Sequence, residues 1–201
     1  MPLALDHVIV CVADLAQASR EFEDRYGVVS VEGGRHRGHG TANRLIPLGD
    51  NYVELLAVVA PKEAKTSALG TWALHQAAVP GGDAVCLRTD DLDGVCARLG
   101  LTPDPMSRVT PDGMILDWRL AGMKQAFANR LPFFIQWDVP DDLHPGRIAV
   151  EHPAGQVRLV ETTISGNPAH VGRLQDWAPD PEGVDYVEGE PGVSYLLVAS
   201  P

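Results

Sequence analysis

Apolar residues near the start of the chain come in short runs that predict a strand, a helix and three more strands. Residues 5–12 are apolar and β-branched, as in a buried strand. Asp14 suits a helix N-cap, apolar residues recur at helical spacing over residues 15–26, and Gly27 suits the position just past a helix end. The later strands are expected at residues 28–32, 42–48 and 52–59.

The same order of elements begins again near Asp83. Residues 6–10 and the Asp14 that follows them correspond to residues 83–87 and to Asp91. A helix at residues 66–78 is expected to connect the two units. The second unit is expected to have strands at residues 83–89, 106–109, 114–121 and 133–137, with a helix that ends near Gly100.

The remaining residues, from 138 onward, are rich in Pro and Gly but still contain apolar segments that need a sheet to pack on. We expect strands there at residues 147–150, 157–164, 184–187 and 193–199, and a helix at residues 170–177. The sequence therefore predicts an α+β fold in which two tandem βαβββ modules form a pseudo-twofold, partly closed mixed β-sheet around a cleft. The helices lie outside, and a partial βαβ unit is added at the C-terminus. We expect one structural domain with a first module (1–62), a connecting helix (63–82), a second module (83–140) and a C-terminal extension (141–201) that packs on the same sheet.

The composition of the chain excludes several classes of protein. Its 201 residues carry a net charge of −11, and because phosphate binding needs a positive surface, nucleic acid is not an expected partner. No apolar run approaches the roughly 20 residues that span a bilayer, and no signal peptide pattern is present, so we expect a cytoplasmic protein. The cysteines, Cys11, Cys86 and Cys96, form no CxxC pair and are odd in number, which argues against structural disulfides and a thiolate zinc site.

Two strands of the first module each carry a residue that is able to bind a metal. Because side chains alternate along a strand, His7 shares a face with Leu5 and Ile9, opposite an all-valine face. If the helices cover the valine face, His7 points into the cleft. Glu54 lies in the fourth strand, where a buried carboxylate needs a partner, a metal or water. A His nitrogen with a Glu oxygen suits a divalent first-row metal; the alternative is a surface glutamate and a core histidine.

The second unit offers a further ligand at a repeat-related position. Gln136 occupies the place that Glu54 has in the first unit, and its amide oxygen is a weak ligand. Ala84 occupies the place of His7 and has no ligand atom. The metal ligands expected from this argument are His7, Glu54 and Gln136, with His7 and Glu54 also the candidate catalytic residues.

Positive charge gathers in one short segment of this acidic chain. Residues 35–44 contain arginines and histidines but no acid, which makes them a candidate anion site. The alternative is a solvated hairpin tip. A guanidinium pairs with a carboxylate in bidentate fashion, and Asn43 is suited to orient an oxygen. The candidate substrate-binding residues are Arg35, His36, Arg37, Asn43 and Arg44, with Trp137, Trp118 and Phe134 either as aromatic walls or as core residues.

These motifs resemble the vicinal oxygen chelate superfamily, which includes glyoxalase I, extradiol dioxygenases, epimerases and antibiotic-binding resistance proteins, and within it the glyoxalase-like domain family. The resemblance implies a divalent metal (Zn, Ni, Mn or Fe) held by His7 and Glu54, with the remaining ligands supplied by the second unit. His36 or His152 could also complete the ligand set. The chain departs from the glyoxalase I ligand set at Ala84 and Gln136. The motifs that carry the resemblance are Leu5-Asp6-His7-Val8, Gly33-Gly34-Arg35-His36, Gly40-Thr41-Ala42-Asn43 and Tyr52-Val53-Glu54-Leu55.

Two functions stay open on this evidence. The first is a metal-dependent enzyme of the lyase, isomerase or hydrolase type that polarises a small carbonyl or vicinal-oxygen compound, with or without a carboxylate. The second is a metal-free protein that binds or sequesters a small molecule on the same fold. The expected partner is a small molecule in both cases, not nucleic acid or a membrane, and the pairing of two chains as a homodimer is left open.

Overall fold

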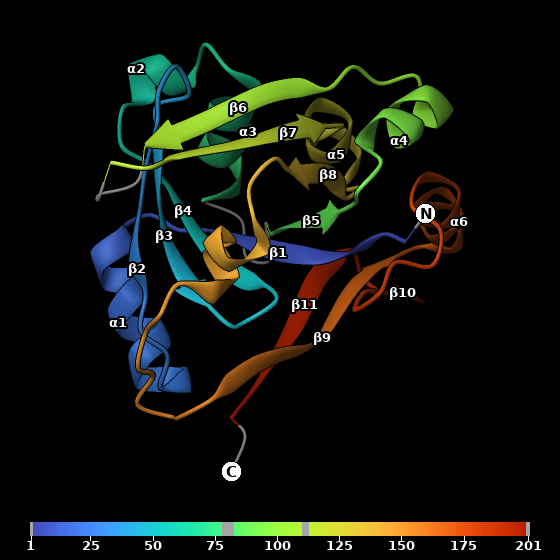
Figure 1. Ribbon diagram of the computed structural model, residues 1–201. Coiled ribbons are helices and arrows are strands. Elements are labelled where there is room, and N and C mark those ends of the chain that lie inside the picture. Colours follow the sequence, from blue (N-terminus) through green and yellow to red (C-terminus); the bar gives the residue numbers. More distant parts are fainter. Residues whose placement is uncertain (1, 78–82, 110–112, 200–201) are drawn as a thin grey trace.

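The computed structural model of the protein describes residues 2–77, 83–109 and 113–199 (Figure 1). Its largest element is a curled sheet of eight strands in the order β2-β3-β4-β1-β5-β8-β7-β6. Ala78, the expected last residue of the connecting helix, lies outside the described residues. The strands are β1 (Ala4–Cys11), β2 (Val31–His36), β3 (Thr41–Pro47), β4 (Tyr52–Val58), β5 (Ala84–Arg88), β6 (Asp104–Val109), β7 (Ile115–Ala121) and β8 (Phe133–Trp137).

Two units of the same topology meet at the centre of this sheet. β1 and β5 pair antiparallel, and each is flanked by the last strand of its own unit, because β4 pairs parallel with β1 and β8 pairs parallel with β5. The two remaining strands of each unit extend the sheet to its edges, at β2 and β6. The tandem βαβββ modules and the mixed sheet predicted from the sequence are therefore confirmed.

The helix that follows the first strand of each unit is fixed by the residues at its two ends. In α1 (Leu15–Tyr26), Asp14 caps the first turn and Gly27 ends the helix in the left-handed region, with φ of 64°. In α4 (Leu92–Leu99), Asp91 caps the first turn in the same way.

None of the helices in the described residues is both long enough and apolar enough to cross a membrane.

Apolar side chains form separate clusters on the two faces of the curled sheet. On the convex face, α1, α4 and α6 pack on a cluster that includes Val8 and Phe134. On the concave face, α3 and α5 pack on a cluster that includes Ile9 and Phe133. Because neighbouring residues of one strand belong to different clusters, alternation along β1 and β8 sets which side chains reach the concave side. The other helices are α2 (Pro61–Ala64), α3 (Ala68–Gln76), α5 (Met123–Asn129) and α6 (Pro168–Trp177).

Strand β1 contains an irregularity that corrects one expectation from the sequence. The pairing of β1 with β5 shifts register between Leu5 and His7, as it does at a β-bulge. Leu5, expected on the same face as His7, packs instead with Val8 in the convex cluster. His7 and Ile9 remain on the concave side, where both line a cavity.

The C-terminal segment forms a small second sheet in the order β10-β9-β11. Its strands β9 and β10 are parallel and are connected by α6, and Ile164 of β9 lies in the convex core cluster. A strand expected at residues 147–150 is absent, because the chain follows short 3-10 turns there and then runs without regular structure. The elements of this segment are η1 (Asp141–Leu143), η2 (Pro145–Arg147), β9 (Val157–Gly166), β10 (Asp185–Glu188) and β11 (Gly192–Ala199).

Candidate functional site

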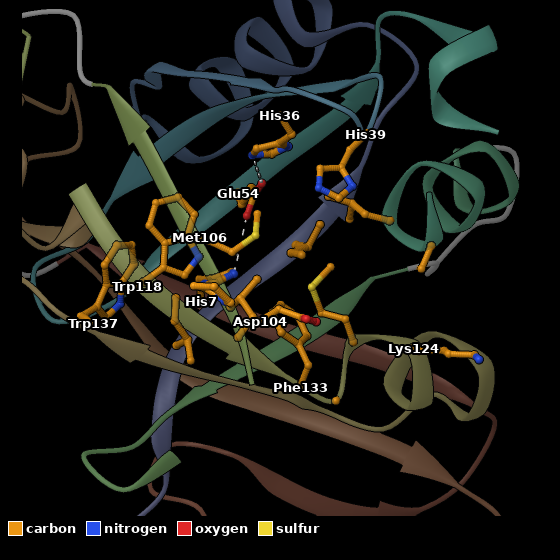
Figure 2. A pocket seen from close by; sticks show the side chains of 18 of the residues that line it. His7, His36, His39, Glu54, Asp104, Met106, Trp118, Lys124, Phe133 and Trp137 are labelled. Carbon is orange, nitrogen blue, oxygen red and sulfur yellow. Dashed lines mark ion pairs between the residues drawn. The ribbon is translucent and has the colours of Figure 1, made fainter. Parts of the chain in front are cut away.

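A cavity of about 680 Å³ lies on the concave side of the main sheet and is lined by strands of both modules and by residues of α3 and α5 (Figure 2). Much of its wall is apolar, but one region holds polar side chains. The polar side chains of this region contact one another and come from the first module, and they are His7, His36, Asn43 and Glu54. Asp104 and Lys124 of the second module also line the cavity.

Glu54 is the acidic member of this polar group and is only 7% exposed. Alternation along β4 places Glu54 on the concave face and Val53 on the convex face. Asn43, on the neighbouring strand β3, donates a hydrogen bond from Nδ2 to Glu54 Oε1 at 2.7 Å. Gly33 leaves room for this amide, because a Cβ at that position would collide with Asn43 Oδ1. The strand register and this close approach therefore hold the carboxylate toward the cavity.

His7 faces Glu54, and a second carboxylate orients its imidazole ring. His7 Nε2 lies 3.5 Å from Glu54 Oε2, and His7 Nδ1 lies 2.6 Å from Asp6 Oδ1. Because a carboxylate only accepts hydrogen bonds, we assign the Nδ1 proton to this contact. A neutral His7 then turns the lone pair of Nε2 toward a carboxylate oxygen, an unfavourable arrangement unless a proton or a cation lies between them.

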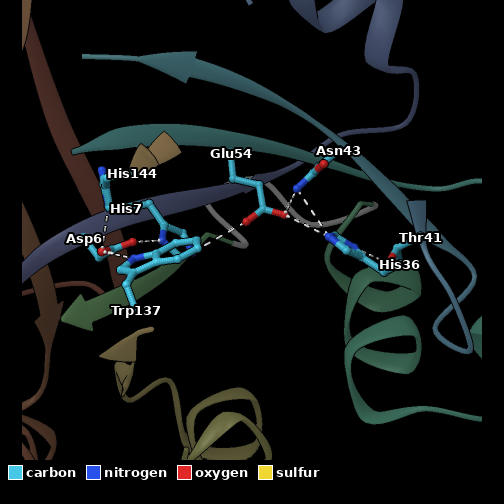
Figure 3. A network of polar contacts seen from close by, with 8 residues as sticks. All are labelled: Asp6, His7, His36, Thr41, Asn43, Glu54, Trp137 and His144. Carbon is cyan, nitrogen blue, oxygen red and sulfur yellow. Dashed lines mark hydrogen bonds and ion pairs between the residues drawn. The ribbon is translucent and has the colours of Figure 1, made fainter. Parts of the chain in front are cut away.

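Asp6 is fully buried and is surrounded by hydrogen-bond donors (Figure 3). Trp137 Nε1 donates to Asp6 Oδ2 at 3.0 Å, and His144 Nε2 lies 3.1 Å from the same oxygen. Since His144 Nδ1 accepts from Gly146 N, the proton of His144 is on Nε2 and is donated to Asp6. Burial by itself raises the pKa of Asp6, but the hydrogen bonds from His144 and His7 outweigh burial and hold this pKa below its usual range.

His36 approaches Glu54 from the side opposite to His7 (Figure 3). His36 Nε2 lies 3.9 Å from Glu54 Oε1 and 3.3 Å from Asn43 Nδ2. Its Nδ1 lies 2.9 Å from the Thr41 hydroxyl. If the Asn43 amide donates to Nε2, the Nδ1 proton is donated to Thr41. Both histidines then direct an unprotonated Nε2 toward the same carboxylate.

Gln136 is not brought to this group, contrary to the expectation from the repeat. Ile135 and Trp137 line the cavity, so alternation along β8 turns Gln136 to the convex side. Its Oε1 accepts hydrogen bonds from Leu92 N at 3.0 Å and from Arg119 Nη2 at 2.9 Å. The repeat match that pointed to Gln136 is one residue out of phase, and in a strand one residue reverses the face.

The predicted arginines divide between the mouth of the cavity and the outside of the sheet. Arg35 and Arg37 are exposed and line a second hollow, of about 670 Å³, which includes residues of the edge strands β2 and β6. This hollow shares His36 with the main cavity. Arg44 lies on the other face of β3 and donates to the hydroxyl and the carbonyl of Ser30 at 2.9 and 2.6 Å.

Of the two histidines expected to complete the ligand set, the structure places His36 beside Glu54 and His152 elsewhere. His152 Nδ1 accepts from Val29 N at 3.0 Å, and its Nε2 lies 2.8 Å from the carbonyl oxygen of Pro47. Both ring nitrogens of His152 thus bridge two segments of the backbone, which is a structural role.

The sequence pattern does not single out Asp6 or His144. Neighbouring residues of a regular strand face opposite sides, and only the bulge in β1 brings Asp6 behind His7. His144 lies in a turn whose path no periodicity predicts. The one available signal is the adjacency of an acid and a histidine at Asp6 and His7, since a metal-binding histidine commonly donates its other ring N–H to a carboxylate.

Two sets of side chains offer metal ligands. In the first, ligand atoms of Asp6, His7 and Cys86 lie within 4.8 Å of one another. Hydrogen-bond donors already occupy the Asp6 oxygens, and burial raises the pKa of the Cys86 thiol well above its usual value, so this set does not offer a ready thiolate. In the second, two imidazoles and a carboxylate converge at Glu54, a donor set typical of zinc and iron.

One pair of ligand atoms in the second set also has the spacing expected around a bound ion. Two ligand atoms at about 2.1 Å from a tetrahedral ion lie about 3.4 Å apart. The distance between His7 Nε2 and Glu54 Oε2 is 3.5 Å. His7 and Glu54 therefore form a candidate pair of ligands for a divalent metal, whereas His36 Nε2 lies farther out, 3.9 Å from the other Glu54 oxygen.

Two βαβββ modules around a ligand cavity define the class of protein as one with the vicinal oxygen chelate fold. A family model described as "Glyoxalase-like domain" matches residues 5–178. The chain therefore belongs to the glyoxalase-like domain family, which confirms the resemblance drawn from its motifs.

Solved structures match this chain to different degrees, and the first of the following shares its fold. A hypothetical protein from Staphylococcus aureus matches with a TM-score of 0.72 and 19% identity over 94% of this chain and 87% of that chain. A methylmalonyl-CoA epimerase variant from Streptomyces coelicolor, in complex with 2-nitronate-propionyl-CoA, matches with a TM-score of 0.48 and 16% identity over 69% of this chain and 100% of its own. The methylmalonyl-CoA epimerase from Mycobacterium tuberculosis matches with a TM-score of 0.46 and 20% identity over 68% and 89%. No curated protein sequence matches this chain.

Proposed function

We propose that the protein is a metal-dependent enzyme of the lyase, isomerase or hydrolase type that holds its substrate through two neighbouring oxygens. The observation that carries the proposal is the approach of His7 Nε2 and Glu54 Oε2 to 3.5 Å inside the cavity. His7, Glu54 and His36 are the proposed ligands of zinc, nickel, manganese or iron. A divalent ion, when bound, supplies Lewis-acid polarisation of a substrate oxygen.

The roles of the surrounding residues follow from their contacts. Asp6 keeps the Nδ1 proton of His7 engaged and leaves Nε2 free for the site. Asn43 holds Glu54 in place through one of its oxygens. A ligand that fills the space against the apolar wall would exclude water and so strengthen the electrostatic interactions within the cavity.

The two exposed arginines at the mouth support a substrate that carries a carboxylate. Arg35 and Arg37 line the hollow that adjoins the polar group. They are cations on a chain with a net charge of −11, so they provide a local attraction for an anion.

The test is metal binding by the purified protein and by variants of the proposed ligands. We expect protein prepared without chelators to bind Zn²⁺ or Mn²⁺ at a single site in calorimetric titrations. His7→Ala and Glu54→Gln are expected to weaken this affinity at least ~100-fold, because each variant removes one imidazole or carboxylate ligand of the ion. Matched controls are His75→Ala and Glu32→Gln, which alter exposed side chains outside the cavity. Undetectable metal binding, or equal loss in the controls, contradicts the proposal.

A metal-free binding protein is the second candidate, and one observation favours it. Strand β8 of the second module lines the cavity with the apolar residues Phe133 and Ile135, where a two-sided metal site would need ligands. A small molecule that raises the melting temperature equally in the wild type and in Glu54→Gln, with no metal present and no turnover, would establish this function instead.

A further inference from the structure

The contacting polar group of the cavity and its largest apolar surface come from different modules, although Asp104 and Lys124 of the second module also line the cavity. The polar side chains that contact one another, His7, His36, Asn43 and Glu54, all come from the first module. The strands of the second module face this group mainly with apolar side chains. These second-module side chains are Met106, Trp118, Leu120, Phe133, Ile135 and Trp137.

Three of these apolar side chains form a row across neighbouring strands. Met106 of β6 pairs in register with Trp118 of β7, and Trp118 pairs with Trp137 of β8. The two indole rings lie 5.4 Å apart between centroids and are tilted by 43°. The hydrogen bond from Trp137 Nε1 to Asp6 fixes one end of the row beside the polar group. The row is therefore a continuous apolar surface that begins next to His7.

This row is only partly covered by the described part of the protein. Met106, Trp118 and Trp137 are each only partly buried, although all of them line the cavity. Removing apolar surface from water is favourable by roughly 25 cal/mol per Å², so such a surface inside a cavity is a binding surface for an apolar group. Figure 2 shows Trp118 and Trp137 next to one another, to the left of His7 and Glu54.

The size of the cavity points in the same direction. At about 680 Å³ it falls in the range of roughly 300–1,000 Å³ that is typical of sites for drug-sized ligands. A small carbonyl compound of about five non-hydrogen atoms fills only a minor part of that space, since one water molecule takes about 30 Å³. The small substrate expected from the sequence would leave the apolar row in contact with water.

We propose that the ligand is amphipathic, with a head that carries two neighbouring oxygens and an apolar body of drug size. The head lies at His7 and Glu54, and the body lies along Met106, Trp118 and Trp137. The assignment of the head rests on the proposed function, whereas the assignment of the body rests on the apolar row alone.

Hydroxamates of different chain length test both parts, because each carries two neighbouring oxygens on a variable tail. Acetohydroxamate and octanohydroxamate are titrated calorimetrically into Zn²⁺-loaded protein, with tryptophan fluorescence as a second readout. Burial of about six further carbon atoms along the row is expected to make octanohydroxamate bind at least ~100-fold more tightly. Octanohydroxamate, but not acetohydroxamate, is expected to change the fluorescence of Trp118 and Trp137.

A polar substitution in the row tests the binding of the apolar body separately from the binding of the head. Met106→Gln, which keeps the side-chain length, is expected to reduce the advantage of octanohydroxamate about tenfold and to leave acetohydroxamate binding unchanged. The matched control is Val160→Gln, which alters an exposed apolar residue of β9 outside the cavity. It is expected to change neither affinity.

The possible outcomes distinguish this inference from the proposed function. Equal affinities for the two hydroxamates overturn the inference, and they do so even if Zn²⁺ binds as proposed. Octanohydroxamate binding that persists in EDTA and still depends on Met106 supports the apolar body site and contradicts the metal function. The inference is also overturned if Met106→Gln and Val160→Gln reduce the affinity advantage of octanohydroxamate over acetohydroxamate equally.

Discussion

At the scale of single residues, the candidate site depends on a carboxylate that does not itself line the cavity. Asp6 accepts hydrogen bonds from groups on three separate segments: His7 beside it on β1, Trp137 on β8 and His144 in the turn after β8. The three donors share Asp6 as their acceptor, so the positions of the three side chains are linked. A charge-assisted hydrogen bond of this kind contributes about 1.5–3 kcal/mol.

Replacing Asp6 by asparagine tests whether this carboxylate prepares His7 for a metal. We expect Asp6→Asn to weaken Zn²⁺ binding about 10–100-fold, because the carboxylate behind a ligating histidine orients the ring and raises its basicity. Calorimetric titration measures the affinity, and circular dichroism shows that the variant is folded. Asp90→Asn, at an exposed aspartate, is the control. Unchanged Zn²⁺ affinity in folded Asp6→Asn would show that Asp6 has a structural role alone.

The residues of the site differ in how well the sequence could predict them. Strand alternation directs His7 and Glu54 to one face, and the structure has them 3.5 Å apart. Only its adjacency to His7 pointed to Asp6, because the bulge that turns it behind His7 depends on the pairing between strands and not on the residues of one strand. Gln136 was wrongly predicted to belong to the site. An error of one residue in aligning the two repeats assigns a strand residue to the wrong face.

At the scale of elements, the side chain of Gln136 connects β8 to the start of α4. Its oxygen accepts from Leu92 N, one of the first backbone N–H groups of the helix, and from Arg119 on β7. The first N–H groups of a helix have no partner within the helix. Gln136 therefore stabilises a helix end on the convex face rather than a metal in the cavity.

A truncation at this position tests that role. We expect Gln136→Ala to lower the free energy of unfolding by about 1–2 kcal/mol, because two donors lose their acceptor. Urea denaturation measures the change in stability, and Zn²⁺ titration of the same variant is expected to match the wild type. A loss of Zn²⁺ affinity comparable to that of Glu54→Gln would instead place Gln136 in the site.

Elements with clear end signals were predictable, and elements without them were not. The caps of α1 at Asp14 and Gly27 are visible in the sequence and are present in the structure. Helix α5 was not predicted, because its N-cap is Gly122, which has no side chain to accept a hydrogen bond and gives no start signal. The strand expected at residues 147–150 is absent, so an apolar segment next to Pro and Gly does not suffice to form a strand.

At the scale of the whole molecule, the small C-terminal sheet shares its core with the main sheet. Leu159 and Ile164 of β9 belong to the same apolar cluster as Val8 of β1 and Phe134 of β8. A further link is the backbone hydrogen bond from Leu5 N to the carbonyl oxygen of Glu182, at 2.8 Å. The two sheets are therefore expected to unfold together.

Truncation of one buried side chain measures this connection. Ile164 is 2% exposed, and we expect Ile164→Ala to cost about 2–4 kcal/mol in the free energy of unfolding. Val160→Ala, at a neighbouring residue that is 52% exposed, is expected to change the stability by no more than about 0.5 kcal/mol. Chemical denaturation followed by circular dichroism is expected to show one transition in both variants. Two resolved transitions would show that the C-terminal sheet unfolds on its own.

The division of the cavity wall between the two modules has a consequence for how such proteins diversify. Substitutions in β6 and β7 can accumulate without disturbing the imidazoles and the carboxylate of the other half, whereas Trp137 is tied to both halves through Asp6. A mutant library confined to residues 104–121 should therefore yield altered ligand preference with intact ion affinity. In this arrangement one copy of the repeated unit would keep the proposed ion ligands while the other varies the surface that contacts the rest of the ligand.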